Sequence, residues 1–408
     1  MSRSYQISKE VRSIGEAVSI YFNQLVYDKK RRGQDIVTLS LGEAFFKIPA
    51  FDFGAIPWEK GYHYSDSRGI PELREKLAQL YKTQYSATVD PAGQIMITAG
   101  SKAAIFMAMR AVLEPGDKVL MHEPAWLSYE TQAMLIDAVP GFIPHDVPVK
   151  DFARHFDDRT RLLVINNPNN PAGRIYSHEE MRQLYEACRE HGIWLMVDEA
   201  YGDFCDADKF GSMTSIVPGL EGVIVVNSLS KNMGMSGWRI GYAISSPDFI
   251  DQLLKLNQHL ITCAPTLLQY YLAHYFDDIL SLTLPQAQAA LTKRRRVAEE
   301  IRKVGLDCLN GDSTFYFFVS IGSFPGTSFD LAVHLLLEKG IAVVPGSAYG
   351  KGTDRFIRVS IGTESEERIA GALREIKAAI RQPVDRQRLI RQLQDSGLRE
   401  MSEMVSVA

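Results

Sequence analysis

The chain has 408 residues, of which 46% are hydrophobic and 23% charged, and its formal net charge is −4 at pH 7. This is the composition of an ordinary globular protein with material for one large domain or two, and the slight negative charge argues against a general nucleic-acid binder. No apolar run approaches the length of a membrane span, the histidines form no metal-ligand pattern and the four cysteines form no C-x-x-C pair, so we expect no membrane insertion, no metal site and a reducing cytoplasm as the location.

Short apolar segments predict six buried strands, at residues 94–98, 118–122, 162–166, 193–197, 223–227 and 240–244. Helix-like segments separate several of these strands. The clearest helix begins at Ser177, where Glu180 completes a capping-box pattern, and ends before Gly192. Alternation of this kind predicts an α/β fold in which a mostly parallel central sheet is covered by helices.

The pattern changes beyond about residue 285. A long charged helix is followed by apolar runs at 314–321, 341–344 and 355–361, with a helix near 328–339. These elements predict a second, smaller α/β domain. Residues 383–408 predict an appended amphipathic helix and a loose end, to which we assign no function.

Polar residues recur where the predicted strands end, which is where open α/β sheets bind ligands. Gly100, Ser101 and Lys102 follow the first strand, where a new helix can offer free N–H groups to a phosphate, or where a serine simply caps the helix. Trp126 offers a flat face to an aromatic ligand, or packs in the core. Asn170 lies in a turn sequence whose amides can equally satisfy their own backbone.

The next two strands end in residues of more specific chemistry. Asp198 places a carboxylate at the end of an apolar strand, which is costly unless the carboxylate has a partner; a protonated pyridine nitrogen and a helix N-terminus are the alternatives. Ser228, Ser230 and Lys231 follow the next strand, and Arg239 comes eight residues later. A lysine can condense with an aldehyde, while two hydroxyls and a guanidinium can hold a phosphate. Pyridoxal 5'-phosphate carries both an aldehyde and a phosphate. The plainer alternative is that Lys231 is a solvated surface residue and that Arg239 pairs with a carboxylate.

In this order the segments resemble the class I/II aminotransferases, the fold type I family of pyridoxal-phosphate enzymes, over about residues 12–380 and nearest to its bacterial aspartate-aminotransferase-like branch. The resemblance implies that Lys231 forms the Schiff base (the internal aldimine), that Asp198 meets the pyridine nitrogen and that Trp126 stacks on the ring. The phosphate would be held by Gly100, Ser101, Lys102, Ser228, Ser230 and Arg239, with Lys102 contributing its backbone. Asn170 and Tyr201 would contact the phenolic oxygen of the cofactor.

The same resemblance implies residues for the substrate and a partner. Gly42, Asn170 and Arg358 would bind the substrate, with Arg358 gripping its α-carboxylate, although an edge-strand arginine facing water is the alternative. Tyr64 resembles the tyrosine that reaches the phosphate of a neighbouring subunit, which implies a homodimer. The family's organisation divides the chain into an N-terminal segment (1–47) that joins the small domain, a large domain (48–285), the small domain (286–382) and the tail (383–408).

The expected reaction is transfer of an amino group between an α-amino acid and an α-keto acid, with a lyase, cyclase or synthase on the same scaffold as the alternative. The sequence departs from the family pattern at the site entrance, where Ala44, Phe45 and Phe46 follow Glu43, and at Ala172. Residues 259–266 contain none of the arginines that meet a distal carboxylate in dicarboxylate-specific relatives. We therefore expect a preference for neutral, apolar or aromatic amino acids, received by Phe45, Phe46 and Ile261.

Overall fold

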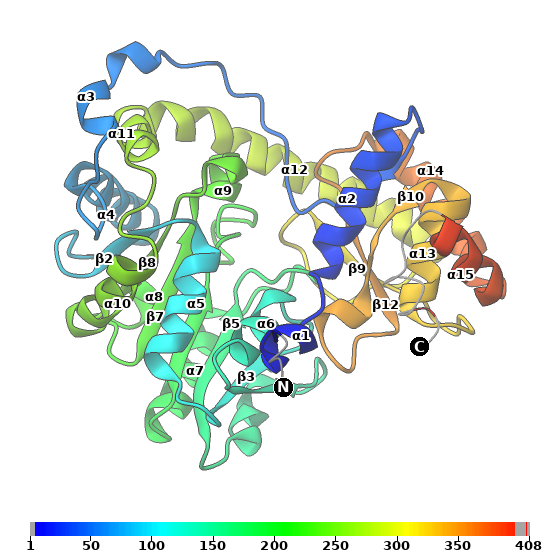
Figure 1. The fold of residues 1–408 in the computed structure, drawn as a ribbon, viewed down its shortest axis with the longest axis horizontal. Helices are drawn as coiled ribbons and strands as arrows, with labels where there is room; N and C mark the ends of the chain where they lie inside the picture. The colour runs from blue at the N-terminus through cyan, green and yellow to red at the C-terminus, as the bar shows by residue number, and fades with distance from the viewer. Residues whose placement is uncertain (1–4, 396–404, 406–408) are drawn as a thin grey trace.

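A seven-stranded sheet forms the centre of the larger half of the molecule (Figure 1). In the computed structural model, which describes residues 5–395 and residue 405, the strand order is β2-β8-β7-β6-β5-β3-β4, and only β8 runs antiparallel to its neighbours. The strands are β2 (Ile95–Thr98), β3 (Lys118–His122), β4 (Val139–Ile143), β5 (Thr160–Asn166), β6 (Trp194–Asp198), β7 (Val223–Ser228) and β8 (Gly241–Ser245). The predicted fold class is confirmed, and all six predicted strands are present to within about two residues.

Helices bury both faces of this sheet, because each strand alternates its side chains between two apolar layers. In β6, Leu195 and Val197 face one layer and Met196 faces the other. The first layer includes α4 (Pro71–Tyr85), α7 (His178–Glu190), α8 (Met213–Ile216) and α11 (Thr266–His274); the second includes α5 (Ser101–Val112), α6 (Ser128–Met134) and α10 (Pro247–Leu260). Burial on both faces is why the strands read as continuous apolar runs.

The capping box predicted at the start of α7 is present. The Ser177 hydroxyl accepts a hydrogen bond from the Glu180 backbone at 3.1 Å, and the Glu180 carboxylate accepts one from the Ser177 backbone at 2.8 Å. These two bonds satisfy backbone donors that a helix start leaves open. They fix the beginning of the helix that connects β5 to β6.

The smaller half is built on a three-stranded antiparallel sheet, ordered β11-β12-β9, and a short parallel pair, β1 with β10. Its elements are α2 (Val18–Arg31), β1 (Val37–Thr38), β9 (Tyr316–Ser320), α13 (Ser328–Lys339), β10 (Ile341–Ala342), β11 (Val344–Pro345), β12 (Phe356–Ser360), α14 (Glu366–Ile380) and α15 (Arg386–Asp395). The apolar run predicted at 341–344 is therefore two strands in two sheets. One core gathers Phe22 of α2 with residues of α13 and α14, so the N-terminal helix packs in this half.

A 29-residue helix, α12 (Phe276–Val304), joins the two halves. Its first turns, with Phe276 and Ile279, pack in a core of the larger half, and its last turns, with Val297 and Ile301, pack in the core of the smaller half. The helix is continuous through Pro285 and so begins earlier than the predicted start near residue 285.

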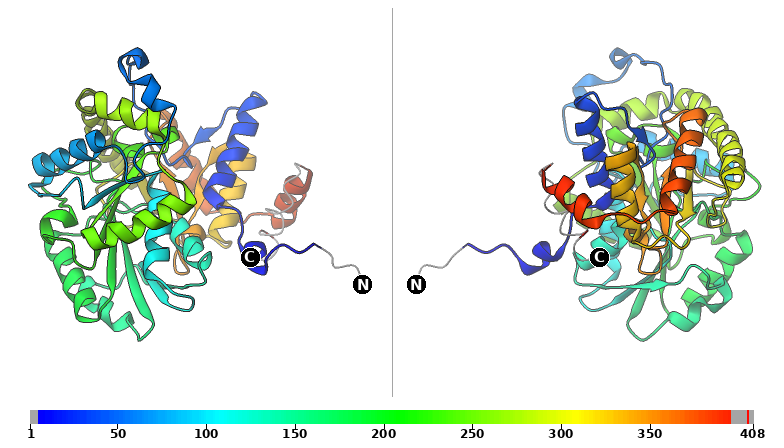
Figure 2. Two further views of the ribbon diagram at one scale, coloured as in Figure 1. Left: turned by 60° about the vertical axis from the view of Figure 1, so that its left-hand side comes forward. Right: turned by 90° about the vertical axis from the view of Figure 1, so that its right-hand side faces the viewer.

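The appended helix α15 lies on the outer side of the smaller half, against α13 (Figure 2). Arg386 pairs with the buried Asp330 at 2.8 Å, while Leu389 and Leu393 are buried. The amphipathic helix predicted in the tail is present, and the rest of the tail except residue 405 lies outside the described residues.

The remaining elements are short: α1 (Lys9–Ser13), α3 (Trp58–Gly61), α9 (Leu229–Asn232), and the 3-10 turns η1 (Phe53–Ala55), η2 (Val149–His155), η3 (Ser236–Trp238) and η4 (Gly346–Tyr349). Among the described residues, no helix has the length and apolarity needed to cross a membrane. Within the same residues, no three His, Cys, Asp or Glu side chains are grouped so that they could hold a metal ion.

Candidate active site

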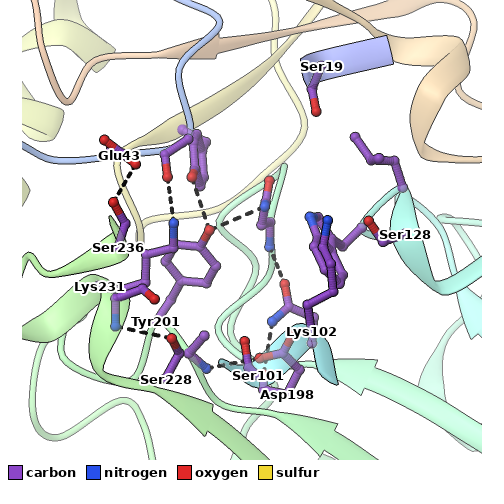
Figure 3. A pocket seen from close by; sticks show the side chains of 18 of the residues that line it. Ser19, Glu43, Ser101, Lys102, Ser128, Asp198, Tyr201, Ser228, Lys231 and Ser236 are labelled. Carbon is purple, nitrogen blue, oxygen red and sulfur yellow. Dashed lines mark hydrogen bonds between the residues drawn. The ribbon is translucent and has the colours of Figure 1, made fainter. Parts of the chain in front are cut away.

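The carboxyl ends of the central strands open into a cavity of about 460 Å³ at the junction of the two halves (Figure 3). Side chains from both halves line it. Twelve of the residues predicted for the site are among them: Gly42, Ser101, Lys102, Trp126, Asn170, Asp198, Tyr201, Ser228, Ser230, Lys231, Arg239 and Arg358. Residues spread over more than 300 positions in the sequence therefore share one cavity.

Lys231 projects into the cavity from α9, the short helix that follows β7. Its ammonium donates a hydrogen bond to the Gly42 carbonyl at 2.5 Å and lies 5.7 Å from the centre of the Tyr201 ring. Burial lowers the pKa of Lys231 to about 8, although the nearby Glu43 carboxylate acts in the opposite direction. With a pKa of about 8, the Lys231 amine is half unprotonated near pH 8. The unprotonated form is the one that acts as a nucleophile or a base.

Asp198 ends β6 and is buried, with 6% of its surface exposed. Its carboxylate accepts hydrogen bonds from the Tyr129 hydroxyl at 2.6 Å and from the Ala200 backbone at 3.1 Å. Burial raises the pKa of Asp198, and these two hydrogen bonds counteract the rise because they stabilise the ionised form. The carboxylate is thus held ready for a cationic partner inside the cavity.

A cradle for an anion lies where β2 leads into α5. The helix begins at Ser101 and has no side-chain cap, so its first N–H groups face the cavity end where Arg239 and Ser230 also lie. Gly100 has a φ of 84°, and a Cβ there would lie 2.3 Å from Arg239 Nη2. The absence of a side chain at Gly100 lets the Arg239 guanidinium lie beside the start of α5. The open N–H groups and this guanidinium suit a phosphate group, so the residues present fit the phosphate of pyridoxal 5'-phosphate.

Arg239 is itself held in an uncommon conformation, with a φ of 56°. Its Nη1 donates to the Ser236 carbonyl at 2.7 Å, which fixes the guanidinium beside Gly100. Left-handed backbone at a non-glycine residue is costly and is typical of sites where a side chain must be aimed at a ligand.

A chain of hydrogen bonds connects the larger half to the smaller one across the cavity. Tyr201 accepts from Asn170 Nδ2 at 3.3 Å, and Asn170 Oδ1 accepts from Arg358 Nη1 at 3.2 Å. Arg358 also donates to the Ser40 carbonyl at 2.6 Å and is buried, whereas the plainer alternative had it facing water. Its Nε has no partner among the described residues, so the guanidinium keeps a free donor.

Several features of the site were not predicted from the sequence. Tyr129 and Tyr316 hydrogen-bond to Asp198 and Tyr201, and helix α2 supplies Ser19, Ile20 and Asn23 to the wall. Lys102 was expected to contribute only its backbone, but its side chain lines the cavity, with the ammonium 5.2 Å from the centre of the Trp126 ring. The sequence offered only one signal for Tyr129 and Tyr316, namely that each carries a hydroxyl. Their partners, Asp198 and Tyr201, are distant from them in the sequence.

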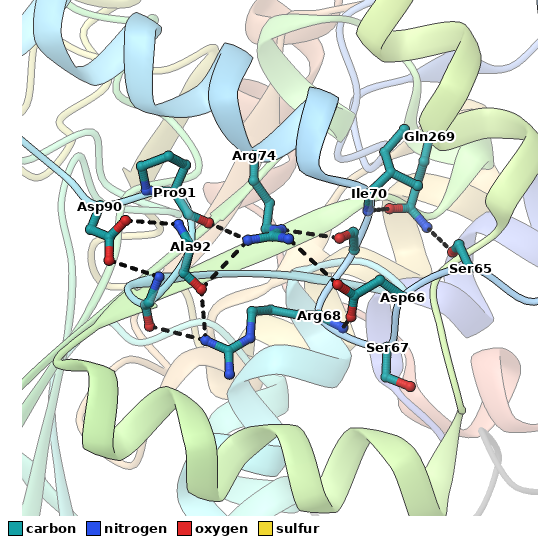
Figure 4. A network of polar contacts seen from close by, with 12 residues as sticks. Ser65, Asp66, Ser67, Arg68, Ile70, Arg74, Asp90, Pro91, Ala92 and Gln269 are labelled. Carbon is teal, nitrogen blue, oxygen red and sulfur yellow. Dashed lines mark hydrogen bonds and ion pairs between the residues drawn. The ribbon is translucent and has the colours of Figure 1, made fainter.

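Tyr64 does not line this cavity and is 84% exposed. The loop that follows it is firmly held (Figure 4). Arg74 Nε donates to the Gly69 carbonyl at 3.0 Å, Arg68 Nη1 donates to the Ala92 carbonyl at 2.8 Å, and Gln269 accepts from the Ile70 backbone at 3.0 Å. Tyr64 therefore lies at the surface directly before a segment whose backbone is fixed.

The family model described as aminotransferase class I and II matches residues 59–376. The chain belongs to this family. It is an aminotransferase, and aminotransferases of this family depend on pyridoxal phosphate.

Among curated relatives of the aminotransferase, the (5-formylfuran-3-yl)methyl phosphate transaminase of Methanocaldococcus jannaschii is 34% identical over 85% of this chain and 91% of its own length. The aspartate aminotransferase of Thermotoga maritima is 31% identical over 85% of this chain and 92% of its own length. The solved aspartate aminotransferase of Thermus thermophilus with maleate has a TM-score of 0.81 and 26% identity, covering 92% of this aminotransferase and all of that chain. These neighbours carry the fold type I architecture.

Proposed function

We propose that this aminotransferase holds pyridoxal 5'-phosphate in the cavity described above and uses it on an α-amino acid that carries a second anionic group. The observation that carries the proposal is the convergence of Lys231, Asp198 and Arg358 on one cavity. An amine of lowered pKa, a buried carboxylate and a buried guanidinium are the three groups that amino transfer needs.

The cofactor would be held by complementary groups already in position. Its phosphate would lie against the start of α5 with Ser230 and Arg239, its ring against Trp126, and its protonated nitrogen against Asp198. When bound, pyridoxal phosphate supplies an aldehyde that condenses with amines and a ring that withdraws electrons from the substrate Cα. Asp198 would keep the ring nitrogen protonated because its carboxylate is buried and, among the described residues, has no cationic side chain bonded to it.

Lys231 would carry the proton that amino transfer must move. Its neutral amine would take the proton from the substrate Cα and return it on the cofactor side, a transfer that one flexible side chain can perform. The Gly42 carbonyl, which accepts the Lys231 hydrogen bond, would hold the amine in place between the two positions.

Arg358 would bind the α-carboxylate of the substrate. The Arg358 guanidinium lies over the Tyr316 ring, 4.6 Å from its centre, and donates hydrogen bonds to Asn170 and Ser40. These contacts fix the plane of the guanidinium. A fixed fork of donors matches a carboxylate in two hydrogen bonds and so orients the substrate Cα towards Lys231.

Lys102 supports a different substrate preference from the one expected from the sequence. Phe45, Phe46 and Ile261 do not line the cavity of the described chain, and Phe45 is 66% exposed. Lys102 does line it, and its ammonium has no hydrogen bond or ion pair with a side chain among the described residues. An amino acid with a distal carboxylate or phosphate would pair with this cation, which is consistent with the aspartate and phosphate-bearing substrates named for the relatives.

The exposed position of Tyr64 supports a homodimer in which this tyrosine reaches the phosphate of the neighbouring subunit. The four cysteines are free thiols, two of them buried, which supports a reducing compartment such as the cytoplasm.

A single-turnover experiment tests the proposal. The loaded protein mixed with one amino acid and no keto acid should release about one equivalent of keto product per site and then stop until an acceptor is added. Continued turnover without an acceptor would instead indicate a lyase or synthase.

The substrate class is tested with the Lys102→Met variant, which keeps the backbone at the start of α5. Its kcat/KM for aspartate should fall by about 10- to 100-fold while the value for phenylalanine changes little, since only the distal ion pair is lost. A wild-type protein that prefers phenylalanine to aspartate would contradict this assignment and restore the expectation from the sequence.

A further inference from the structure

Tyr316 lies on β9 in the smaller half and faces the cavity from the side opposite the central sheet. Its side chain is fully buried, and its hydroxyl lies 3.0 Å from the hydroxyl of Tyr201. The backbone around it is fixed, because Arg294 Nη1 donates to the Tyr316 carbonyl at 2.6 Å and Thr314 accepts from the Tyr316 N–H at 3.2 Å. The position of this hydroxyl is therefore set by the fold of the smaller half.

The hydrogen-bonding capacity of Tyr201 limits the two hydroxyls to two arrangements. A phenol has one proton and two lone pairs. Asn170 Nδ2 donates to the Tyr201 oxygen, so one lone pair is already used. If Tyr201 donates to Tyr316, it has no proton left for the cavity, and Tyr316, which also lines the cavity, would present its own proton there instead.

The opposite arrangement leaves the Tyr201 proton for the cavity. If Tyr316 donates to Tyr201, both lone pairs of Tyr201 are occupied, by Asn170 and by Tyr316, and its only proton must point elsewhere. Because a buried donor without an acceptor is costly, the free proton points into the cavity, where a bound ligand can accept it.

We propose that Tyr316 is a positioning residue that directs the proton of Tyr201 into the cavity, towards the phenolic oxygen of the cofactor. This role rests on the proposed binding of pyridoxal phosphate in the cavity. The hydroxyl of Tyr316 acts through Tyr201, while its ring, which packs against Arg358 at 4.6 Å, separately supports the carboxylate-binding arginine.

The role has a spectroscopic consequence. A hydrogen bond donated to the phenolic oxygen draws negative charge from it and makes the nitrogen that links the cofactor to Lys231 less basic. A misdirected Tyr201 proton weakens this bond, so the linking nitrogen holds its proton to higher pH. The pH at which the visible absorption band of the loaded protein changes should therefore rise.

The experiment compares the loaded wild type with Tyr316→Phe, Tyr201→Phe and the double variant. Tyr316→Phe keeps the ring and should raise the midpoint by about 0.5 to 1 pH unit, the equivalent of one net hydrogen bond. Tyr201→Phe should raise it at least as far. The double variant should match Tyr201→Phe, because Tyr316 then has no hydroxyl to direct.

Tyr349→Phe is the matched control. Tyr349 is also buried with its ring facing Arg358, at 5.5 Å, but its hydroxyl is not bonded to Tyr201 in the described chain, so its loss should leave the midpoint unchanged. Thermal unfolding of each variant without cofactor verifies that the fold is intact. An unmoved midpoint in Tyr316→Phe, or additive shifts in the double variant, would overturn the role of Tyr316 alone. A wild type whose visible band does not form at Lys231 would overturn the proposed function and this role with it.

Discussion

The Tyr129 hydroxyl donates a hydrogen bond to Asp198 Oδ2 across 2.6 Å, and the Tyr129 ring meets Trp126 edge-on at 5.2 Å. One side chain of α6 thus touches two residues proposed to hold the cofactor ring. Burial raises the pKa of Asp198, and the bond from Tyr129 opposes this rise because it stabilises the ionised carboxylate.

Replacing Tyr129 by Phe should therefore lower kcat by about tenfold, because a charge-assisted hydrogen bond to the carboxylate is lost while the ring packing on Trp126 is kept. The pKa of Asp198 rises in this variant, so activity should also be lost at a higher pH on the acid side. A pH profile of kcat measures both effects. Tyr176→Phe, which removes a buried hydroxyl bonded to His122 outside the cavity, is the control; equal profiles for the two variants would contradict the role of Tyr129.

The lowered pKa of Lys231 predicts how the protein takes up its cofactor. Only the neutral amine condenses with an aldehyde, and with a pKa of about 8 the neutral fraction rises about tenfold per pH unit below pH 8 and levels off above it. The rate of absorbance change on adding pyridoxal phosphate to the unloaded protein should follow this curve. Glu43→Gln should shift the curve to lower pH, because the Glu43 carboxylate raises the pKa of Lys231. A rate that is independent of pH between 6 and 9, or borohydride label on another lysine, would show that Lys231 is not the attachment point.

Gly100→Ala tests the phosphate cradle. The new Cβ would lie 2.3 Å from Arg239 Nη2, so the guanidinium must move, and cofactor affinity should fall by at least about tenfold. Gly116 has a nearly identical φ, 89° against 84°, but nothing lies within 4 Å of a Cβ there. Gly116→Ala thus places a side chain at a similar positive φ without the clash, and equilibrium titration with pyridoxal phosphate should show an unchanged affinity. Equal losses in both variants would assign the effect to strain alone.

Arg358→Lys keeps the charge but removes the planar fork. KM for the amino donor should rise by about 10- to 100-fold with a smaller change in kcat, because the α-carboxylate loses one of two directed hydrogen bonds. Steady-state kinetics with several donors measure this split. An unchanged KM would place the carboxylate elsewhere in the cavity.

The burial of Glu199, the neighbour of Asp198, leads us to expect that the stability of the protein depends on pH. It is 1% exposed, one of its oxygens accepts a bond from the Met213 backbone at 2.8 Å, and burial raises its pKa to about 8 from the usual 4.5. Between these two pH values the unfolded chain releases the proton that the folded chain keeps, so stability falls as pH rises from 4.5 to 8 and this decline ends above 8.

Glu199→Gln mimics the protonated acid at every pH. Its Tm should match that of the wild type near pH 5 and exceed it at pH 9, by an amount corresponding to a few kcal/mol. Differential scanning fluorimetry of the unloaded protein at the two pH values measures the difference. A Tm gap that does not widen with pH would show that Glu199 is ionised in the folded protein.

The strands of the central sheet were predictable because both faces of each are buried, which leaves long apolar runs such as that of β7. The edge strand β4 was missed, since Pro140 and Gly141 interrupt its run; an edge strand tolerates a proline because half of its backbone groups need no partner. The start of α12 was misplaced because Pro285 resembles a helix start, although here it lies inside a helix.

Most of the proposed site was predictable for a different reason: its residues follow strands, and the carboxyl ends of parallel strands meet at one edge. Tyr129 and Tyr316 follow no such rule. Their partners are 69 and 115 residues away and are found only when helices and the smaller half are packed. The direction of the Lys102 side chain, whose ammonium lies over the Trp126 ring in the cavity, likewise depends on packing and not on sequence spacing.

The helix α12 begins in one core and ends in the other, so its residue count fixes the orientation of the smaller half. Insertion of one residue in its middle would rotate everything beyond it by about 100° and advance it by about 1.5 Å. The bond of Arg358 to Asn170, which joins the two halves at 3.2 Å, could not survive such a turn. Among homologues that keep the bond between Arg358 and Asn170, insertions and deletions should therefore be confined to loops and be absent from α12. The length of α12 sets the distance and the angle between the two halves that form the active site.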